Sequence, residues 1–456
     1  MKYIKGKWFP AVCICIALLL GLTACSGKAP AESDSGSGTS SNGTTTAASA
    51  STATSSALDS STTETDTNGT LDTTDTSDKS AETSTTATKA PPKNSTSATT
   101  SKTKATDSTS PVKVVQSLNN TYYKLTVEKK LTVGYIGGSI TVGIGASDLD
   151  KTSWRALTTQ WLKKTYPSAT IREGNAAIGS TGSLLGACRV GDELLDDYKP
   201  DLIFAEFAIN DYYQGCLYED SIRNMETFVR IVLKNNPNTD IVFVYTTDCG
   251  FRGKMFDAVS AFEAVAKHYG LYTINVGKEL ADREGAEALN LSGKYLTDSV
   301  HPNDAGHAKY SSYVTEFLST QFKKCEKDYQ PHSIPAPFRG VLFEKATLIS
   351  GNEILASNSS LQSSGDLNTI RGTVRLSGGD AFTIKFKGKG LAMRWRSAVG
   401  ANIVLRLDKK ESTLPIGNLD NAQQVIFNDL SNTEHTLQVI NKGSTICYIN
   451  GFYALE

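Results

Sequence analysis

The stretch "VGYIGGSITVG", residues 133–143, passes from an apolar run into two glycines, a serine and a threonine. Such an apolar run is typical of a buried strand. Two interpretations fit the way it ends. In the simpler one the segment is a tight turn, because glycine tolerates unusual backbone angles and serine is common in turns. In the other it is a nucleophile elbow, in which the glycines allow a ligand to approach Ser139 closely.

The sequence around this stretch alternates strand-like and helix-like segments over residues 113–328. Apolar runs predict strands over 131–137, 169–176, 201–209, 240–247 and 271–276. Periodic apolar positions predict helices over 153–167, 182–198, 221–237, 258–270 and from near Pro302 to residue 322. Five such alternations predict an α/β domain with a doubly wound parallel sheet. Ligands bind at the carboxyl ends of the strands in such sheets, where Ser139 and Asn210 are expected.

The pattern changes after "PHSIPAPF", residues 331–338. Short alternating strands follow, separated by Gly, Asn and Asp, so residues 338–456 are expected to form an all-β sandwich. This pattern is similar to the galactose-binding-like jelly rolls attached to many carbohydrate-active enzymes, which makes the region a candidate carbohydrate-binding module. Four aromatic residues either line a sugar platform there or pack in the sandwich core, namely Trp395, Tyr448, Phe452 and Tyr453.

The first 25 residues have the features of an export signal. Three lysines precede an apolar core that is too short to span a membrane comfortably. The sequence "LTAC", residues 22–25, resembles a bacterial lipobox, in which the cysteine (here Cys25) becomes lipid-modified. An ordinary cleavable signal peptide is the alternative. With the lipobox, the protein is expected at the extracytoplasmic face of the bacterial cell membrane, attached to it by an N-terminal lipid anchor.

Residues 26–112 are dominated by Ser, Thr, Ala, Asp and Gly. Such a segment cannot bury enough apolar surface to offset the entropy lost on ordering, so it is predicted to be a disordered tether. The net charge of −1 gives no indication of a nucleic-acid partner. The five cysteines that follow residue 25 are widely spaced, and the chain has neither a CxxC pair nor an HExxH motif. We therefore expect no metal and no cofactor.

Four short blocks occur in order along the α/β region. "GGSIT" holds Ser139, "NAAIGSTGS" holds Gly179, "FAIND" holds Asn210, and "DSVHP" holds Asp298 and His301. This order resembles the SGNH (GDSL-like) hydrolase superfamily over residues 131–322. The resemblance implies a flavodoxin-like fold and a serine hydrolase that cleaves ester bonds. It also implies an oxyanion hole made by the backbone N–H groups of Ser139 and Gly179 and the side-chain amide of Asn210.

Two positions depart from the pattern of the superfamily. Gly138 stands where many relatives have an aspartate before the serine. In the second block, the donor glycine falls on Gly179 or, with a shift, on Ser180, and Gly182 is a third candidate. Any of the three would serve, since the donor is a backbone N–H. The triad itself is unaffected by either departure.

The chemistry of these residue types supports a nucleophile, a base and a carboxylate partner independently of the resemblance. A serine hydroxyl is a poor nucleophile until a base takes its proton, and His301 is the natural base for Ser139. Asp298 lies three residues before His301, so its carboxylate can reach the other ring nitrogen and stabilise the imidazolium. His307 is the rival base, but its place in the last helix favours packing or surface exposure.

We expect the protein to be a serine esterase that removes O-acetyl or other short acyl groups from a polysaccharide or a cell-envelope glycan. A surface-anchored chain with a flexible tether and a jelly-roll-like region suits esters on polymers. A lipase or lysophospholipase of the same superfamily is the alternative enzyme, and an acyltransferase could use the same triad. A non-catalytic, carbohydrate-binding surface lipoprotein is the alternative from a different class.

Overall fold

The structure is a computed structural model that describes residues 116–291, 293–364, 372–397, 402–415 and 422–456. The predicted signal peptide, Cys25 and the whole of the predicted tether lie outside these residues. Among the described residues, no helix is both long enough and apolar enough to cross a membrane. The same residues contain no group of three or more side chains placed to hold a metal ion.

The first half of the described chain forms a five-stranded sheet whose neighbouring strands are all parallel, in the order β2-β1-β3-β4-β5. The strands are β1 (Lys130–Gly137), β2 (Thr170–Asn175), β3 (Leu202–Glu206), β4 (Asp240–Tyr245) and β5 (Tyr272–Asn275). The chain places β2 on one side of β1 and then crosses to the other side, where β3, β4 and β5 follow in turn. The predicted doubly wound fold is confirmed.

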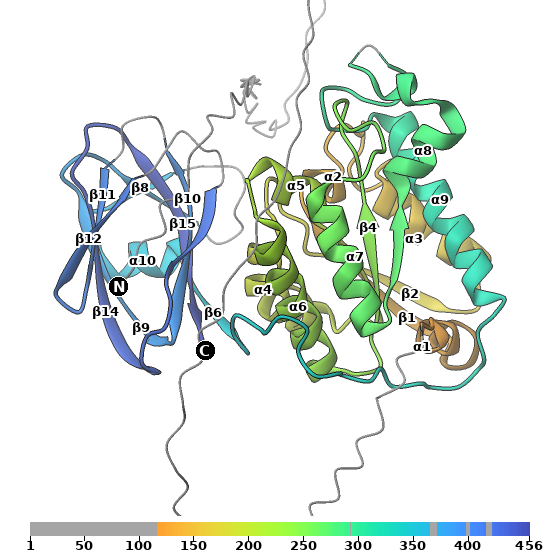
Figure 1. Ribbon diagram of the computed structural model, residues 1–456, viewed down its shortest axis with the longest axis horizontal. Coiled ribbons are helices and arrows are strands. Elements are labelled where there is room, and N and C mark those ends of the chain that lie inside the picture. Colours follow the sequence, from red (N-terminus) through yellow and green to blue (C-terminus); the bar gives the residue numbers. More distant parts are fainter. Residues whose placement is uncertain (1–115, 292, 365–371, 398–401, 416–421) are drawn as a thin grey trace, which may run out of the picture. The chain divides into compact units, whose positions relative to one another are not determined.

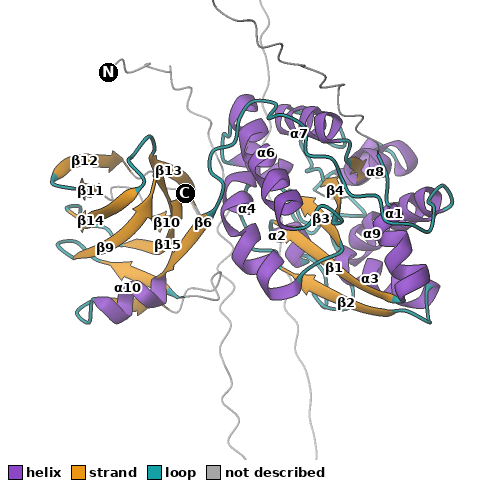
Figure 2. Cartoon of the chain, turned by 90° about the horizontal axis from the view of Figure 1, so that it is seen from below, coloured by secondary structure: helices purple, strands orange, loops and turns teal. Residues whose placement is uncertain are grey.

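Helices cover both faces of this sheet. Figures 1 and 2 show α3 and α9 on one face and α4 and α6 on the other. The helical elements are α1 (Asn119–Tyr123), η1 (Lys124–Glu128), α2 (Ser139–Val142), α3 (Trp154–Thr165), α4 (Ser183–Val190), η2 (Gly191–Asp196), α5 (Ala208–Tyr213), α6 (Tyr218–Asn235), α7 (Asp257–Tyr269), α8 (Val276–Glu284), η3 (Ala286–Leu289) and α9 (Asp304–Phe322).

Two element ends differ from the sequence-based expectation. The strand expected over 201–209 ends at Glu206, and the chain turns at Phe207 (φ −140°, ψ −15°) into α5. The sequence hides this turn because apolar residues continue through it. The last helix, expected to begin near Pro302, begins at Asp304, since the side chain of Asn303 caps it by accepting a hydrogen bond from the Gly306 N–H.

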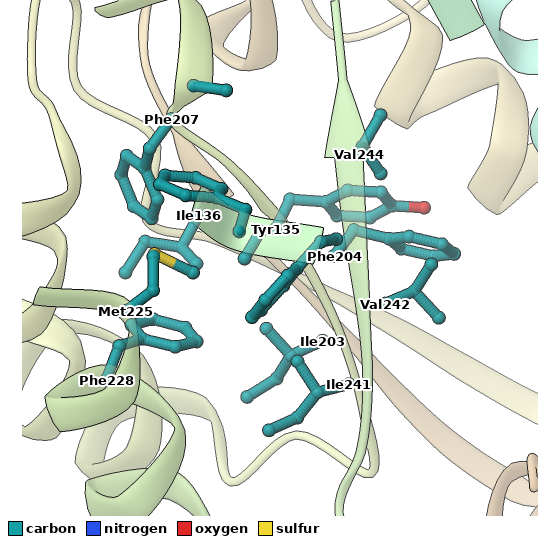
Figure 3. Packing of buried hydrophobic residues seen from close by; sticks show 14 of the residues in the cluster. Tyr135, Ile136, Ile203, Phe204, Phe207, Met225, Phe228, Ile241, Val242 and Val244 are labelled. Carbon is teal, nitrogen blue, oxygen red and sulfur yellow. The ribbon is translucent and has the colours of Figure 1, made fainter. Parts of the chain in front are cut away.

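The core of the α/β region lies between the sheet and its helices. Every residue of β3 and of β4 is buried, as expected for central strands covered on both faces. Figure 3 shows Met225 and Phe228 of α6 packed toward Ile136 and Phe207, with Phe204 on the central strand. This packing fixes the sheet edge from which the loops after β1, β3 and β4 emerge.

The C-terminal region contains two antiparallel sheets. One has the order β13-β10-β15-β8-β7 with β6 also paired to β15, and the other has the order β12-β11-β14-β9. The strands are β6 (Ala346–Ser350), β7 (Gln362–Ser364), β8 (Thr373–Leu376), β9 (Ala381–Gly388), β10 (Gly390–Ser397), β11 (Asn402–Leu407), β12 (Lys410–Pro415), β13 (Ala422–Phe427), β14 (Thr433–Asn441) and β15 (Cys447–Leu455). The expected all-β fold is confirmed, with one short helix, α10 (Gly351–Ser357).

Three of the four aromatic residues considered for a sugar platform are buried, and the fourth, Tyr448, is partly buried. Trp395, Phe452 and Tyr453 are each no more than 4% exposed. Trp395 and Phe452 belong to the sandwich core together with side chains from the other sheet, such as Phe382. For these residues, packing in the interior is therefore the correct interpretation of the two that the sequence left open.

Candidate active site

Ser139 is the first residue of α2, and Gly138 alone separates it from the end of β1. The two positions before it require glycine because neighbouring side chains approach the backbone closely there. A Cβ atom on Gly137 would lie 2.5 Å from Thr141 Oγ1, and one on Gly138 would lie 2.0 Å from Asn210 Oδ1. Gly138 has φ −88°, which any residue adopts, so backbone freedom is not the reason for this glycine. A larger residue in place of Gly138 would displace Asn210.

Ser139, His301 and Asp298 form a hydrogen-bonded series. His301 Nε2 lies 2.8 Å from Ser139 Oγ, and His301 Nδ1 lies 2.7 Å from Asp298 Oδ2. With the Nδ1 proton donated to the carboxylate, Nε2 is free to accept the proton of the serine hydroxyl. The structure therefore brings together the three residues that the sequence nominated as a triad.

The loop that carries the histidine also fixes the aspartate. Asp298 Oδ1 accepts hydrogen bonds from the backbone N–H groups of Val300 and His301, at 2.9 and 2.8 Å. Partial burial opposes ionisation of Asp298, but the hydrogen bonds from the His301 ring and from the backbone outweigh it and lower the pKa of Asp298 to about 2. Asp298 is therefore ionised at neutral pH, where its charge can stabilise the imidazolium form of His301.

Asn210 lies in the first turn of α5, beside the glycine that precedes the nucleophile. Its amide nitrogen would be 3.2 Å from a Cβ atom on Gly138. No residue in the described part of the chain accepts a hydrogen bond from this amide, so its N–H groups remain available to a ligand. Asn210 therefore lies close to the backbone of the nucleophile, where an oxyanion donor is required.

The three candidates for the second backbone donor have different surroundings. Gly179 lies against the nucleophile, since a Cβ atom on it would be 3.8 Å from Ser139 Cβ. Ser180 adopts a left-handed conformation with φ 57°, and its carbonyl oxygen accepts a hydrogen bond from Gln214. Gly182 faces away toward Asp211, whose Oδ1 would be 2.5 Å from a Cβ atom there. Position alone favours Gly179 as the donor.

His307, the rival base, is buried beside the triad without contacting Ser139. Its Nδ1 accepts a hydrogen bond from the backbone N–H of Trp154 at 3.3 Å, and its Nε2 lies 3.2 Å from the carbonyl oxygen of Ile144. Burial lowers the pKa of His307 to about 4, so the ring is neutral at physiological pH. His307 therefore has a structural role and is not the catalytic base.

Sequence reasoning missed a buried carboxylate directly beneath the elbow. Glu206, at the end of β3, accepts hydrogen bonds from the hydroxyls of Thr141 (2.8 Å) and Thr246 (3.0 Å). Its backbone oxygen accepts one from the N–H of Gly138 at 3.2 Å. Burial raises the pKa of Glu206. A charged residue inside the apolar run "LIFAEFAI" was a signal that could have identified it.

A second buried carboxylate joins the elements around the site. Asp211, next to Asn210, accepts hydrogen bonds from the backbone N–H and hydroxyl of Ser183 at 2.7 and 2.6 Å and from the hydroxyl of Ser221 at 3.0 Å. Burial raises the pKa of Asp211 to about 6, although these hydrogen bonds oppose the rise. Asp211 therefore connects α5 to the starts of α4 and α6.

Comparison with known proteins places this geometry in a family. Residues 135–309 match the GDSL-like Lipase/Acylhydrolase family. No curated protein matches the chain. A two-domain esterase active on acetylated mannans, co-crystallised with mannopentaose, is 23% identical with a TM-score of 0.59, and the match covers 75% of this chain and 96% of that one. Another crystal structure of such an esterase gives 22% identity, a TM-score of 0.60 and the same coverage.

A structure of an acetyl xylan esterase from Geobacillus stearothermophilus is 18% identical with a TM-score of 0.35, and the match covers 41% of this chain and 93% of that one. The two-domain matches show that the α/β region and the β region occur together in a known fold. The family match covers the residues that hold Ser139, Asp298 and His301. Residues 135–309 of this chain thus form a GDSL-like lipase/acylhydrolase domain, and the protein is an ester-hydrolysing serine hydrolase.

Proposed function

We propose that the protein removes O-acetyl or other short acyl groups from a polysaccharide or a cell-envelope glycan, with Ser139 as the nucleophile. The observation that carries the mechanism is the continuous series from Ser139 Oγ through the His301 ring to Asp298. His301 takes the hydroxyl proton as Ser139 attacks the ester carbonyl, and Asp298 stabilises the resulting imidazolium.

Attack places a negative charge on the carbonyl oxygen, which requires donors already in position. The backbone N–H groups of Ser139 and Gly179 and the amide of Asn210 are proposed for this role. Collapse of the intermediate transfers the proton from His301 to the leaving sugar oxygen and leaves an acyl group on Ser139. Water, deprotonated by His301, then attacks the acyl-enzyme and releases the carboxylic acid.

The glycan part of the proposal is supported by the two-domain relatives. They are described as active on acetylated mannans, and their fold extends over both regions of this chain. The proposed position outside the membrane, through lipid attached to Cys25, would bring the enzyme to such polymers. Labelling with a fatty-acid analogue tests this anchor. We expect Cys25→Ala to abolish the label and move the protein into the medium, and an unlabelled, fully secreted wild type would refute the anchor.

Release of free acid from a panel of substrates tests the proposed function. The panel contains acetylated mannan, acetylated xylan, O-acetylated peptidoglycan and a long-chain acylglycerol, with wild type and Ser139→Ala compared on each. We expect acetate from at least one glycan, and none above background with the variant. Cleavage of the acylglycerol without release of acetate from any glycan would instead identify a lipase.

A further inference from the structure

A cluster of four aromatic residues and one methionine, partly exposed except for the buried Phe256, lies on elements connected to the active site. We call it the aromatic platform and define it as Tyr212, Tyr213, Phe251, Met255 and Phe256. The rings of Tyr212 and Phe251 meet edge to face at 4.6 Å, and those of Phe251 and Phe256 stack at 4.3 Å. Tyr212, Tyr213 and Met255 are 49%, 42% and 50% exposed. Nothing in the mechanism above uses these residues.

Both parts of the platform are attached to the catalytic elements. Tyr212 and Tyr213 end α5, the helix that carries Asn210. The other members lie on the segment after β4, where the N–H of Cys249 donates to the carbonyl oxygen of Ser299 at 2.8 Å. Ser299 lies in the loop between Asp298 and His301. One part of the platform therefore shares its helix with the proposed oxyanion donor, and the other is hydrogen-bonded to the loop that carries the base.

A buried carboxylate holds the two parts together. Asp248 is 5% exposed, and its Oδ2 accepts a hydrogen bond from the hydroxyl of Tyr213 at 2.7 Å. Its Oδ1 accepts from the backbone N–H groups of Gly250 and Phe251, at 2.9 and 2.6 Å. The segment that presents Phe251 is thus fixed to α5 before any ligand arrives. A preformed surface loses less conformational entropy on binding than a mobile one.

The chemistry of the platform indicates a neutral ring as its ligand. Exposed apolar groups gathered beside an active site mark a binding surface more often than scattered ones do. The face of an aromatic ring is electron-rich, so it attracts the polarised C–H groups on the face of a pyranose, while a phenol hydroxyl can bond to sugar oxygens at the edge. Asp248 is occupied by three donors, and the platform residues themselves carry no charge.

We propose that the aromatic platform is a subsite that stacks a neutral pyranose ring, next to the ring whose ester Ser139 cleaves. This rests on the proposed glycan substrate. Tyr212 supplies the exposed stacking face, Phe251 and Phe256 support it from below, and Asp248 is a positioning residue. The platform therefore contributes to binding of an oligosaccharide much more than to binding of a small aryl ester.

The test compares kcat/KM for an acetylated manno-oligosaccharide with kcat/KM for an aryl acetate. Loss of one aromatic stacking contact is expected to lower kcat/KM for the oligosaccharide about 10-fold more than kcat/KM for the aryl acetate in Tyr212→Ala. Tyr212→Phe keeps the ring and should therefore retain most of the kcat/KM for the oligosaccharide. Asp248→Asn should show part of the selective loss seen in Tyr212→Ala, through a higher KM for the oligosaccharide.

Tyr123→Ala is the matched control. Tyr123 pairs with Tyr329 at 4.4 Å, and Figure 1 shows its helix α1 at the end of the sheet opposite α2 and α5. This variant should match wild type on both substrates. If wild type releases acetate from the oligosaccharide and Tyr212→Ala changes both substrates equally or neither, the platform assignment is wrong and the glycan function stands. If wild type cleaves the aryl acetate but releases acetate from no glycan of the panel above, both proposals fail.

Discussion

Each of the two described regions contains a histidine whose Nδ1 lies against an aspartate, and of these two pairs the one in the α/β region faces a nucleophile. In the α/β region, His301 lies between Asp298 and the hydroxyl of Ser139. In the β region, His435 Nδ1 lies 2.6 Å from Asp408 Oδ2, and its Nε2 lies 2.8 Å from the backbone oxygen of Ser431. The first ring therefore has an acceptor on one side and a hydroxyl on the other, whereas the second has acceptors on both sides.

This difference decides what each histidine can do. Two acceptors favour the doubly protonated ring, and the hydrogen bond to Asp408, followed by that to Ser431, raises the pKa of His435. Such a ring holds its second proton more readily than a free imidazole, and neither of its nitrogens lies against a hydroxyl that it could activate. His301 has the same kind of carboxylate partner but can take a proton from Ser139. The hydroxyl of Ser139, which lies on the other side of the His301 ring, therefore defines the catalytic site, and the His–Asp pair alone does not.

The largest expected difference between the two pairs is in kcat. Asp298→Asn should lower kcat about 10⁴-fold, because an amide in place of the carboxylate favours the wrong tautomer of the histidine. Asp408→Asn makes the same chemical change in the β region and should leave kcat within about twofold of wild type. Steady-state kinetics on an aryl acetate measure both. Comparable losses in the two variants would show that the comparison is mistaken.

A smaller loss is expected at the proposed oxyanion donor. Asn210→Ala should lower kcat by about 10²- to 10³-fold, the usual cost of losing one such donor. KM should change much less, since the interaction strengthens in the transition state. Circular dichroism confirms that the variant is folded. A defect that lies mainly in KM would instead assign Asn210 to substrate binding.

The smallest effect concerns stability and pH. Because the pKa of His435 is raised in the folded protein, its pairing contributes fully below the unfolded value of about 6.5 and is lost as pH rises through the folded value. The contribution should stay below about 1 kcal/mol, since Asp408 is 48% exposed at its side chain and solvent screens the pair. The difference in Tm between wild type and His435→Gln should shrink between pH 6 and pH 8. A difference that stays constant would contradict the pairing.

The α/β fold was predictable because its signals are local. Continuous apolar runs gave the strands, and the end of β1 placed Ser139 at the carboxyl edge of the sheet. The order of the four blocks brought Asn210, Asp298 and His301 to the same edge. The strands needed only the spacing of residues along one segment, whereas the grouping of the four blocks came from their resemblance to the SGNH superfamily.

The remaining features depend on contacts between distant segments. The need for Gly138 comes from Asn210, which lies on another element. Glu206 is held by threonines from two further segments, and the aromatic platform combines α5 with the segment after β4. The burial of Trp395 likewise depends on the packing of a sheet whose strands are far apart in sequence. Local patterns do not contain this information.

Labelling with a serine-reactive phosphonate tests the central claim most directly. Wild type is treated with the reagent, digested and mapped by mass spectrometry, with His301→Ala and His435→Ala treated in parallel. We predict one adduct, on Ser139, formed at the same rate in His435→Ala and at least about 10³-fold more slowly in His301→Ala. An adduct on another residue, or labelling of Ser139 at an unchanged rate in His301→Ala, would contradict the proposed triad.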